Sequence, residues 1–278
     1  MKQVRSSASF LSFPSLPSAL AEKYPAEEFW FRPFGIEESD LAIDFSSADI
    51  VLLVSRILEQ CAENRRGALP KDFFRDLPVG KRLECLLRLA AGGERTSFFF
   101  SFKCASCGED SEFELTLGEI AEQQAEADLT DLIEVETAEG KFVFRKPTGR
   151  DQEVWQESVF DDKQTAAFEM IRALQVSPKK AIKFDSEAFQ KIEEAIDEAD
   201  PLINFVCRVR CADCDSVSEF ETDLCRFALN ELHFSQLRLL NAVHRLASRY
   251  HWSEREIFAV PHWRRLRYLT LIADEKSK

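Results

Sequence analysis

Four cysteines form two Cys-x-x-Cys pairs in this chain, Cys104 with Cys107 and Cys211 with Cys214. Thiolates at this spacing bind metal ions, and a structural zinc ion is held by four ligands in a tetrahedron. One pair supplies only two ligands, so both pairs are needed for a complete set. The sequence therefore predicts one structural zinc ion bound by all four cysteines, with no coordination position left for a water molecule.

Three other interpretations of these cysteine pairs stay open. A redox-active Cys-x-x-Cys lies at the start of a helix after a buried strand, whereas both pairs here lie between strand-like segments. A disulfide within either pair needs an oxidising compartment. Each pair can also be one half of a site that a second chain completes. The separation of Cys107 from Cys211 by 104 positions is long for a compact zinc ribbon, and it needs an explanation.

An internal duplication explains this separation. The segment FFFSFKCASCGEDSEFELTL (98–117) aligns without a gap with FVCRVRCADCDSVSEFETDL (205–224), at an offset of 107 positions. Upstream, FRPFGIEESD (31–40) and FRKPTGRDQE (144–153) also match, with Arg32-Pro33 opposite Lys146-Pro147. In both, proline and glycine end a strand, and acidic residues follow at the expected N-terminus of a helix. We therefore expect two repeats, each contributing one Cys-x-x-Cys hairpin.

The pattern of apolar residues predicts the elements around these motifs. Helices are expected at 50–61, 79–91, 151–160, 163–176 and 187–199, and after Cys225, with Ser253 and Glu256 as a capping box. Residues 132–146 alternate like a β-hairpin that turns at Glu139-Gly140. The fold class expected is α+β, mostly helical and internally duplicated, with two zinc-knuckle β-hairpins sharing one site and a C-terminal helical segment. The expected organisation is a flexible N-terminal arm (1–24), two repeat halves (25–125 and 126–225) and C-terminal helices (226–278).

The net charge of −13 argues against nucleic acid as a partner, because an acidic surface repels phosphate. The cluster of Arg264, Arg265 and Arg267 is expected to be a solvated helix face. No apolar run approaches the roughly 18 residues that cross a bilayer, so no membrane partner is expected. Ala19-Leu20-Ala21 resembles a signal-peptidase site, but Pro14 and Pro17 interrupt the preceding segment. The location expected is the cytoplasm.

The remaining cysteines and the histidines show no catalytic pattern. Cys61 and Cys85 are expected to pack as small apolar residues and Cys207 to have a packing role, and these three and Cys225 are left out of the metal site. The four histidines all fall in the C-terminal helical region. The sequence has no phosphate-binding glycine loop, no dinucleotide fingerprint and no nucleophile elbow. The protein is expected not to be an enzyme.

Several segments, taken in order, resemble the baseplate hub assembly chaperone family of contractile phage tails and of phage-derived contractile injection systems. They are FRPFGIEESD, the LPVGKR turn into ECLLRL, the first Cys-x-x-Cys, FVFRKPTGRDQEVW, the second Cys-x-x-Cys and WSEREIFAVPHWRRLRYLTLI. Together they cover nearly the whole chain after residue 25. The second cysteine pair departs from the pattern, because Asp215 replaces the glycine expected after it.

This resemblance implies a non-catalytic protein that assists or joins the assembly of a baseplate hub. Its partners would then be hub or baseplate proteins. The resemblance leaves open whether the protein remains in the finished particle. Aromatic residues of the last helices are expected either to form a docking face or to pack a helical hairpin; they are Trp252, Phe258, Trp263 and Tyr268. A general zinc-ribbon adaptor between proteins, unrelated to tails, is the alternative function.

Overall fold

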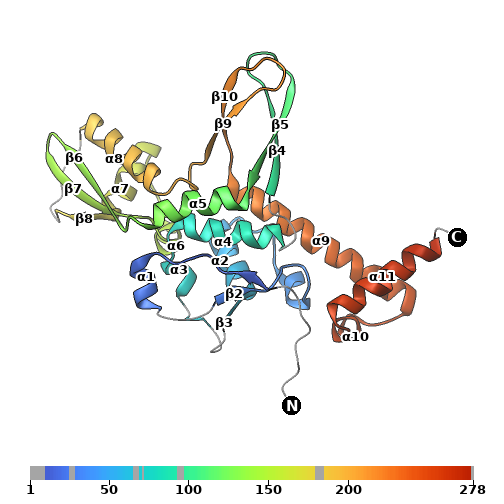
Figure 1. Ribbon diagram of the computed structural model, residues 1–278. Helices are drawn as coiled ribbons and strands as arrows, with labels where there is room; N and C mark the ends of the chain where they lie inside the picture. The colour runs from blue at the N-terminus through green and yellow to red at the C-terminus, as the bar shows by residue number, and fades with distance from the viewer. Residues whose placement is uncertain are drawn as a thin grey trace.

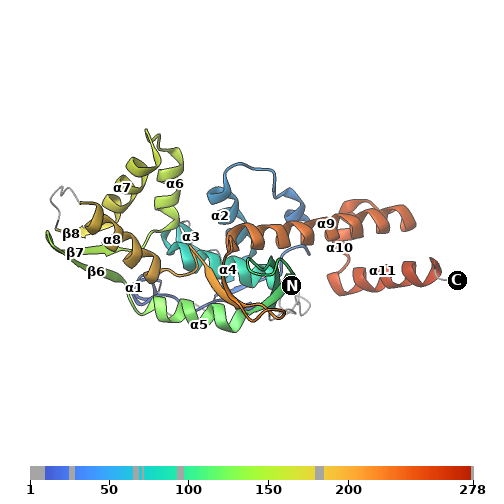
Figure 2. The same cartoon turned by 90° about the horizontal axis from the view of Figure 1, so that it is seen from above.

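The computed structural model describes residues 10–24, 29–64, 69–70, 72–92, 97–178 and 185–276. The fold is α+β, as the sequence predicts, with many helices and small antiparallel sheets. Figure 1 shows a helical body from which two β-hairpins project side by side, with a helical arm leading to the C-terminus. Figure 2 shows, from above, that this arm extends from one side of the body only.

A three-stranded sheet of order β1-β2-β3 begins the body. Its strands are β1 (Leu11–Ser12), β2 (Phe29–Phe31) and β3 (Ala62–Asn64), and the intervening helices are α1 (Ser18–Lys23), the 3-10 helix η1 (Glu38–Ala42) and α2 (Ile50–Cys61). Residues 1–24 were expected to form a flexible arm, but the structure places residues 11–24 against the body. Leu11 pairs with Phe31 and is buried, and Phe13 stacks on the ring of Phe31. Apolar contacts thus hold residues 11–24 on the body, while residues 1–9 lie outside the described part.

The main core forms around two helices whose bounds match the prediction, α2 and α4 (Val79–Ala91), with the short α3 (Phe73–Asp76) before α4. The Asp49 side chain caps α2 by accepting a hydrogen bond of 2.8 Å from the Leu52 N–H. α4 begins after Pro78 and ends at Gly92, whose φ of 67° is the left-handed conformation favoured at a helix C-terminus. α4 is buried along nearly its whole length because α5 and α9 pack against it.

A second three-stranded sheet has the same topology, with order β6-β7-β8. Its elements are β6 (Leu132–Thr137), β7 (Gly140–Arg145), α6 (Gly149–Glu157), α7 (Lys163–Leu174), β8 (Gln175–Ser177) and α8 (Ser186–Ala199). The helix predicted to reach residue 176 ends earlier, because Gln175–Ser177 pair with β7 and Pro178 disfavours helical geometry in the residue before it. In both units the helix before the third strand continues directly into that strand: α2 passes into β3 at Cys61-Ala62, and α7 passes into β8 at Leu174-Gln175.

Each sheet unit also holds an arginine and an aspartate as a two-pronged ion pair. Arg32 lies 3.0 Å and 2.7 Å from the two oxygens of Asp40, and Arg145 lies 2.6 Å and 2.7 Å from those of Asp151. Both aspartates occupy the third position of a helix and complete its capping box. The sequence comparison placed Lys146 opposite Arg32, but by this contact the counterpart is Arg145. Lys146 instead is buried and donates a hydrogen bond to the Ala127 carbonyl.

The two projecting hairpins are β4 (Ser97–Lys103) with β5 (Asp110–Thr116), and β9 (Val206–Arg210) with β10 (Val217–Glu221). Helix α5 (Leu117–Asp128) follows the first hairpin and α9 (Leu224–Tyr250) follows the second. The Phe220 ring of the second hairpin lies 6.0 Å from that of Phe102 and 5.7 Å from that of Phe113, both of the first. These aromatic contacts hold the hairpins side by side.

The C-terminal arm consists of the outer part of α9, α10 (Glu254–Ala259) and α11 (His262–Lys276). The predicted capping box of Ser253 and Glu256 is present. Trp252, Phe258 and Tyr268 pack on the arm's own core, so core packing accounts for three of the four aromatic residues singled out in the sequence, while Trp263 is 60% exposed. No helix in the described ranges is both long and apolar enough to cross a membrane.

A cluster of buried charges joins α4, α5 and the end of α8. Lys81 lies 2.6 Å from a Glu84 oxygen and 2.5 Å from an Asp128 oxygen. Asp200 is fully buried, and one of its oxygens accepts a hydrogen bond of 3.0 Å from the Gly80 N–H. Burial raises the pKa of Asp200 to about 6, and the Asp128 charge adds to this shift, although the Gly80 N–H, Lys146 and Lys81 oppose it.

Asp200→Asn is therefore expected to gain stability relative to wild type as the pH rises. The folded protein binds the Asp200 proton more tightly than the unfolded chain, whose pKa is about 3.9, so the buried carboxylate destabilises the fold above about pH 6 and not below about pH 4. The gain between these limits is about 3 kcal/mol, at 1.36 kcal/mol per pKa unit.

Urea unfolding of both proteins at about pH 4 and about pH 7 measures this difference. Comparison with wild type at each pH removes contributions common to both proteins, including those of the other titrating groups. Glu193→Gln, a change at an exposed carboxyl of α8, is the control and should follow wild type. An equal difference between Asp200→Asn and wild type at both pH values would contradict the prediction.

Candidate metal centre

Each Cys-x-x-Cys lies in the turn of one projecting hairpin. In the first, Lys103 pairs with Asp110 and the Cys104 N–H donates to the Glu109 carbonyl at 2.9 Å. In the second, Arg210 pairs with Val217 and the Cys211 N–H donates to the Ser216 carbonyl, also at 2.9 Å. The two turns therefore have the same hydrogen-bonded frame, with the first cysteine of each pair at the end of a strand.

The two turns meet at their tips and bring the predicted cysteines together. The four Sγ atoms, from Cys104, Cys107, Cys211 and Cys214, all lie within 4.8 Å of one another. The closest contacts cross between the hairpins, with 3.7 Å from Cys104 to Cys214 and 3.7 Å from Cys107 to Cys211. Figure 1 shows the hairpins converging at this point, well away from the body. The structure thus assembles one cluster from both pairs within a single chain.

The sulfur spacing fits a tetrahedral metal site. A tetrahedron with metal–sulfur distances of about 2.3 Å has sulfur–sulfur edges of about 3.8 Å. A disulfide needs about 2.05 Å, and all four cysteines are free thiols. Cys104 and Cys211 are buried while Cys107 and Cys214 are exposed, so the site has an inner and an outer sulfur from each turn. This arrangement can enclose a thiophilic metal ion such as zinc.

The hydrogen bonds at the cluster favour negative sulfur at the inner positions. The Ser216 hydroxyl, with the backbone N–H groups of Cys107 and Ser106, lowers the pKa of Cys104 to about 5. The backbone N–H groups of Cys214 and Asp213, with the Ser111 hydroxyl, lower the pKa of Cys211.

The outer Cys107 thiol behaves differently. The backbone N–H of Glu109 favours its thiolate, but partial desolvation of the sulfur and the three neighbouring thiols outweigh this contact and raise the pKa of Cys107 to about 12. Sulfurs this close disfavour a further negative charge. A bound cation is what allows all four to ionise together, and metal binding would release protons.

Two serines that the sequence pattern did not single out contact the cysteine cluster. The Ser216 Oγ lies 3.3 Å from the Cys104 sulfur and 3.0 Å from the Cys214 sulfur, and the Ser111 Oγ lies 3.7 Å from that of Cys211. Such outer contacts orient metal ligands. Ser111 was visible as a residue shared by the repeats, but Ser216 has Glu109 at the corresponding position and no motif marks it.

The other four cysteines lie apart from this cluster, as predicted. Cys61 and Cys85 are fully buried in the main core, and Cys207 and Cys225 pack against it. Burial raises the pKa of Cys61 to about 12 and that of Cys225 to about 11. These thiols are protonated at neutral pH, unlike the thiolates that bind metals.

The residue after each cysteine pair adopts the left-handed backbone conformation, with φ of 77° at Gly108 and 57° at Asp215. Asp215→Gly is expected to raise the free energy of unfolding by up to about 1 kcal/mol, because glycine has no Cβ to clash in this conformation. Gly108→Ala should lower it by a similar amount, although open space surrounds the added Cβ. Urea unfolding of the purified protein measures both changes, with Asp213→Gly as the control, and no gain for Asp215→Gly beyond that control would contradict the expectation.

Comparisons with protein-family models, with curated proteins and with solved structures found no match to this chain.

Proposed function

We propose that this chain is a non-catalytic assembly protein for the baseplate hub of a contractile tail or injection system, and that a structural zinc ion joins its two projecting hairpins. The observation that carries the zinc assignment is the convergence of four sulfurs, with 3.7 Å contacts between hairpins. Zinc is the ion that four thiolates in a tetrahedron typically hold. Since the cysteines fill all four positions, zinc would act as a structural link rather than a catalyst.

We also propose that the chain arose by internal duplication. The matching sheet orders, the two arginine–aspartate pairs at equivalent helix positions and the two turns with the same hydrogen-bonded frame support this origin. In this account each repeat supplies half of one metal site. Equivalent cysteines are then one repeat offset of 107 positions apart, which leaves the 104 positions between Cys107 and Cys211.

The assembly role rests on the ordered sequence segments that resemble the hub chaperone family. The form of the molecule is compatible with such a role, because the cysteine tips and the C-terminal arm both extend from the body and are accessible to other proteins (Figure 1). A link between two hairpins would fix the tips as one rigid surface. A rigid surface reduces the entropy lost when a partner binds.

The test is to tag the chain in the cell that produces it and to separate finished contractile particles from assembly intermediates. Hub or baseplate proteins are expected to copurify with the chain, and deletion is expected to block baseplate assembly. Cys207→Ser should restore assembly in the deletion strain, whereas Cys104→Ser should not. Copurification with proteins unrelated to tails would favour the general zinc-ribbon adaptor, and an unchanged particle yield after deletion would contradict the assembly role.

A further inference from the structure

The charges of this protein are divided unevenly between residues 1–225 and residues 226–278, which comprise α9 without its first two residues, α10 and α11 and so include the C-terminal arm. Residues 226–278 contain ten Lys and Arg against five Asp and Glu, a net charge of +5. The whole chain carries −13, so residues 1–225 carry −18. An acidic body with a basic arm favours attraction between the arm of one molecule and the body of another.

The outer face of α11 is both apolar and basic. Trp263, Leu266, Arg267 and Thr270 recur at the spacing of one helix face, and all four are exposed. Arg264 is exposed beside them, whereas Arg265 points inward, is buried and donates to the Ile36 carbonyl. Arg267 forms no ion pair with any described residue. We call Trp263, Arg264, Leu266, Arg267 and Thr270 the basic face.

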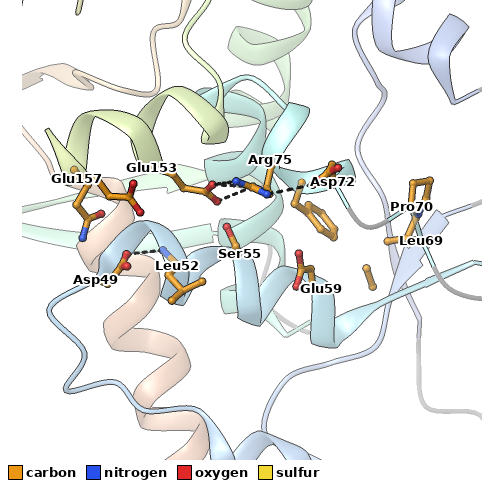
Figure 3. Close-up of a pocket in the computed structure, with 13 residues that line it drawn as sticks. Asp49, Leu52, Ser55, Glu59, Leu69, Pro70, Asp72, Arg75, Glu153 and Glu157 are labelled. Atoms are coloured by element: carbon orange, nitrogen blue, oxygen red, sulfur yellow. Dashed lines mark hydrogen bonds and ion pairs between the residues drawn. The ribbon is translucent and has the colours of Figure 1, made fainter.

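A groove of opposite charge lies on the body between α2, α3 and α6, with a volume of about 780 Å³. One face of α2 forms its floor through Leu52, Ser55 and Glu59, and the half-buried Leu69 adds apolar surface at one end. Figure 3 shows the groove running along α2 from Asp49 and Glu157 at one end to Leu69 and Pro70 at the other. This acidic groove is thus a helix surface bordered by carboxylates.

The carboxylates of the acidic groove are only partly neutralised. Five line it, and its one basic residue, Arg75, is already engaged by Glu153 and Asp72 (Figure 3). Asp49 is occupied in capping α2. Glu59 and Glu157 form no hydrogen bond or ion pair with any residue in the described ranges. Burial raises the pKa of Glu59, which a cationic partner would offset.

We propose that the acidic groove receives the basic face of a second copy of this chain. Both features are helical and of similar length, since the 12 residues of α2 span about 18 Å and the 15 of α11 about 22 Å. In this pairing the Trp263 and Leu266 side chains cover Leu52 and Leu69, while the arginines meet Glu59 and Glu157. A helix laid in an apolar groove with complementary charges at its rim is a recurring mode of recognition.

The pairing has to be between molecules. Figures 1 and 2 both show α11 well apart from α3 and α6, so the basic face cannot reach the groove of its own chain. Each copy then offers one groove and one basic face, and contacts of this head-to-tail kind continue into a ring or an open chain. A second acidic pocket, between α5 and α8, is smaller at about 540 Å³, and Glu134 there is already paired with Lys141.

Sedimentation velocity of the full-length protein tests this pairing. The wild type is expected to associate with increasing concentration at about 50 mM NaCl and to dissociate at about 500 mM, because the contact depends on exposed charges. The arm variant Arg264→Glu/Arg267→Glu and the groove variant Glu59→Lys/Glu157→Lys should each associate at least about tenfold more weakly. Glu126→Lys/Glu198→Lys, which makes the same charge change in the second pocket, should behave as wild type.

Mixing the two deficient variants gives the decisive result. The groove variant keeps an intact basic face and the arm variant keeps an intact groove, so an equal mixture should form dimers that grow no further. Circular dichroism of each variant checks that it is folded. A wild type that stays monomeric at low salt would overturn the proposal, as would a mixture that stays monomeric or a loss of association in the second-pocket variant alone. The measurement uses the purified protein, so its outcome is independent of any role in tail assembly.

Discussion

Cys104→Ser is expected to abolish zinc binding and to destabilise both projecting hairpins. Zinc bound by four thiolates in small domains contributes about 10–16 kcal/mol of apparent binding energy at neutral pH, and this energy is coupled to folding. The hairpins here are also held by the contacts of Phe220 with Phe102 and Phe113, so we expect a smaller loss, on the order of 5 kcal/mol, confined to the hairpins. Hydrogen exchange across 97–116 and 206–221 should accelerate by several orders of magnitude.

Cys211→Ser should have the same effect as Cys104→Ser, because the two sulfurs occupy equivalent inner positions and are buried to 1% and 2% exposure. Cys207→Ser is the matched control, since Cys207 lies on β9 only four positions from Cys211 and outside the cluster. It should keep zinc and leave hydrogen exchange at the tips unchanged. Acceleration limited to one hairpin in either inner variant would show that the two turns do not share an ion.

Away from the cysteines, Asp40→Ala is expected to be the most destabilising change and to lower the free energy of unfolding by about 3–5 kcal/mol. Asp40 is completely buried, and one oxygen accepts hydrogen bonds from the N–H groups of Gly35, Ile36 and Glu37. Removing its carboxylate leaves the Arg32 guanidinium buried without a carboxylate that can pair with it through two oxygens. The exposed Glu37 carboxylate, 3.3 Å away, replaces this interaction only in part.

Asp151→Ala is the natural comparison, because Asp151 forms the equivalent two-pronged ion pair in the second unit, with the Thr148 N–H and hydroxyl as its other donors. Its partner Arg145 is 38% exposed at the side chain, so water can solvate the guanidinium after the change. We expect the free energy of unfolding to fall by about 1–2 kcal/mol, clearly less than for Asp40→Ala. Urea unfolding of the two variants, with Asp44→Ala as a control at an exposed carboxylate, measures the difference. Equal losses at Asp40 and Asp151 would contradict the role assigned to burial.

The sequence predicted well the features that depend on local pattern. The apolar spacing gave the bounds of α2 and α4 to the residue, and strand alternation gave the β6–β7 hairpin, whose turn at Ala138-Glu139 lies one residue before the predicted one. The cysteine cluster was also predictable, since spacing indicated the ligands and the repeat indicated that two distant pairs belong together. These signals are carried by residues close together in the chain or repeated along it.

Features made by contacts between distant segments were not visible in the sequence. The strand of Leu11 and Ser12 is two residues long and forms only because β2 offers it a pairing edge. Arg145 was passed over because a one-residue difference in spacing aligned Lys146 with Arg32 instead. The acidic groove combines side chains from Asp49 to Glu157, which no local pattern connects. Such arrangements depend on tertiary packing rather than on propensity.

The central claim is that four cysteines of one chain enclose one zinc ion, and the metal content of the purified protein tests it most directly. Elemental analysis is expected to find one zinc per chain in wild type and in Cys207→Ser, and none in Cys104→Ser or Cys211→Ser. X-ray absorption of the wild type should show four sulfur ligands at about 2.3 Å. Wild-type protein without zinc, zinc retained after loss of either inner cysteine, or a shell with fewer than four sulfurs would contradict the shared site.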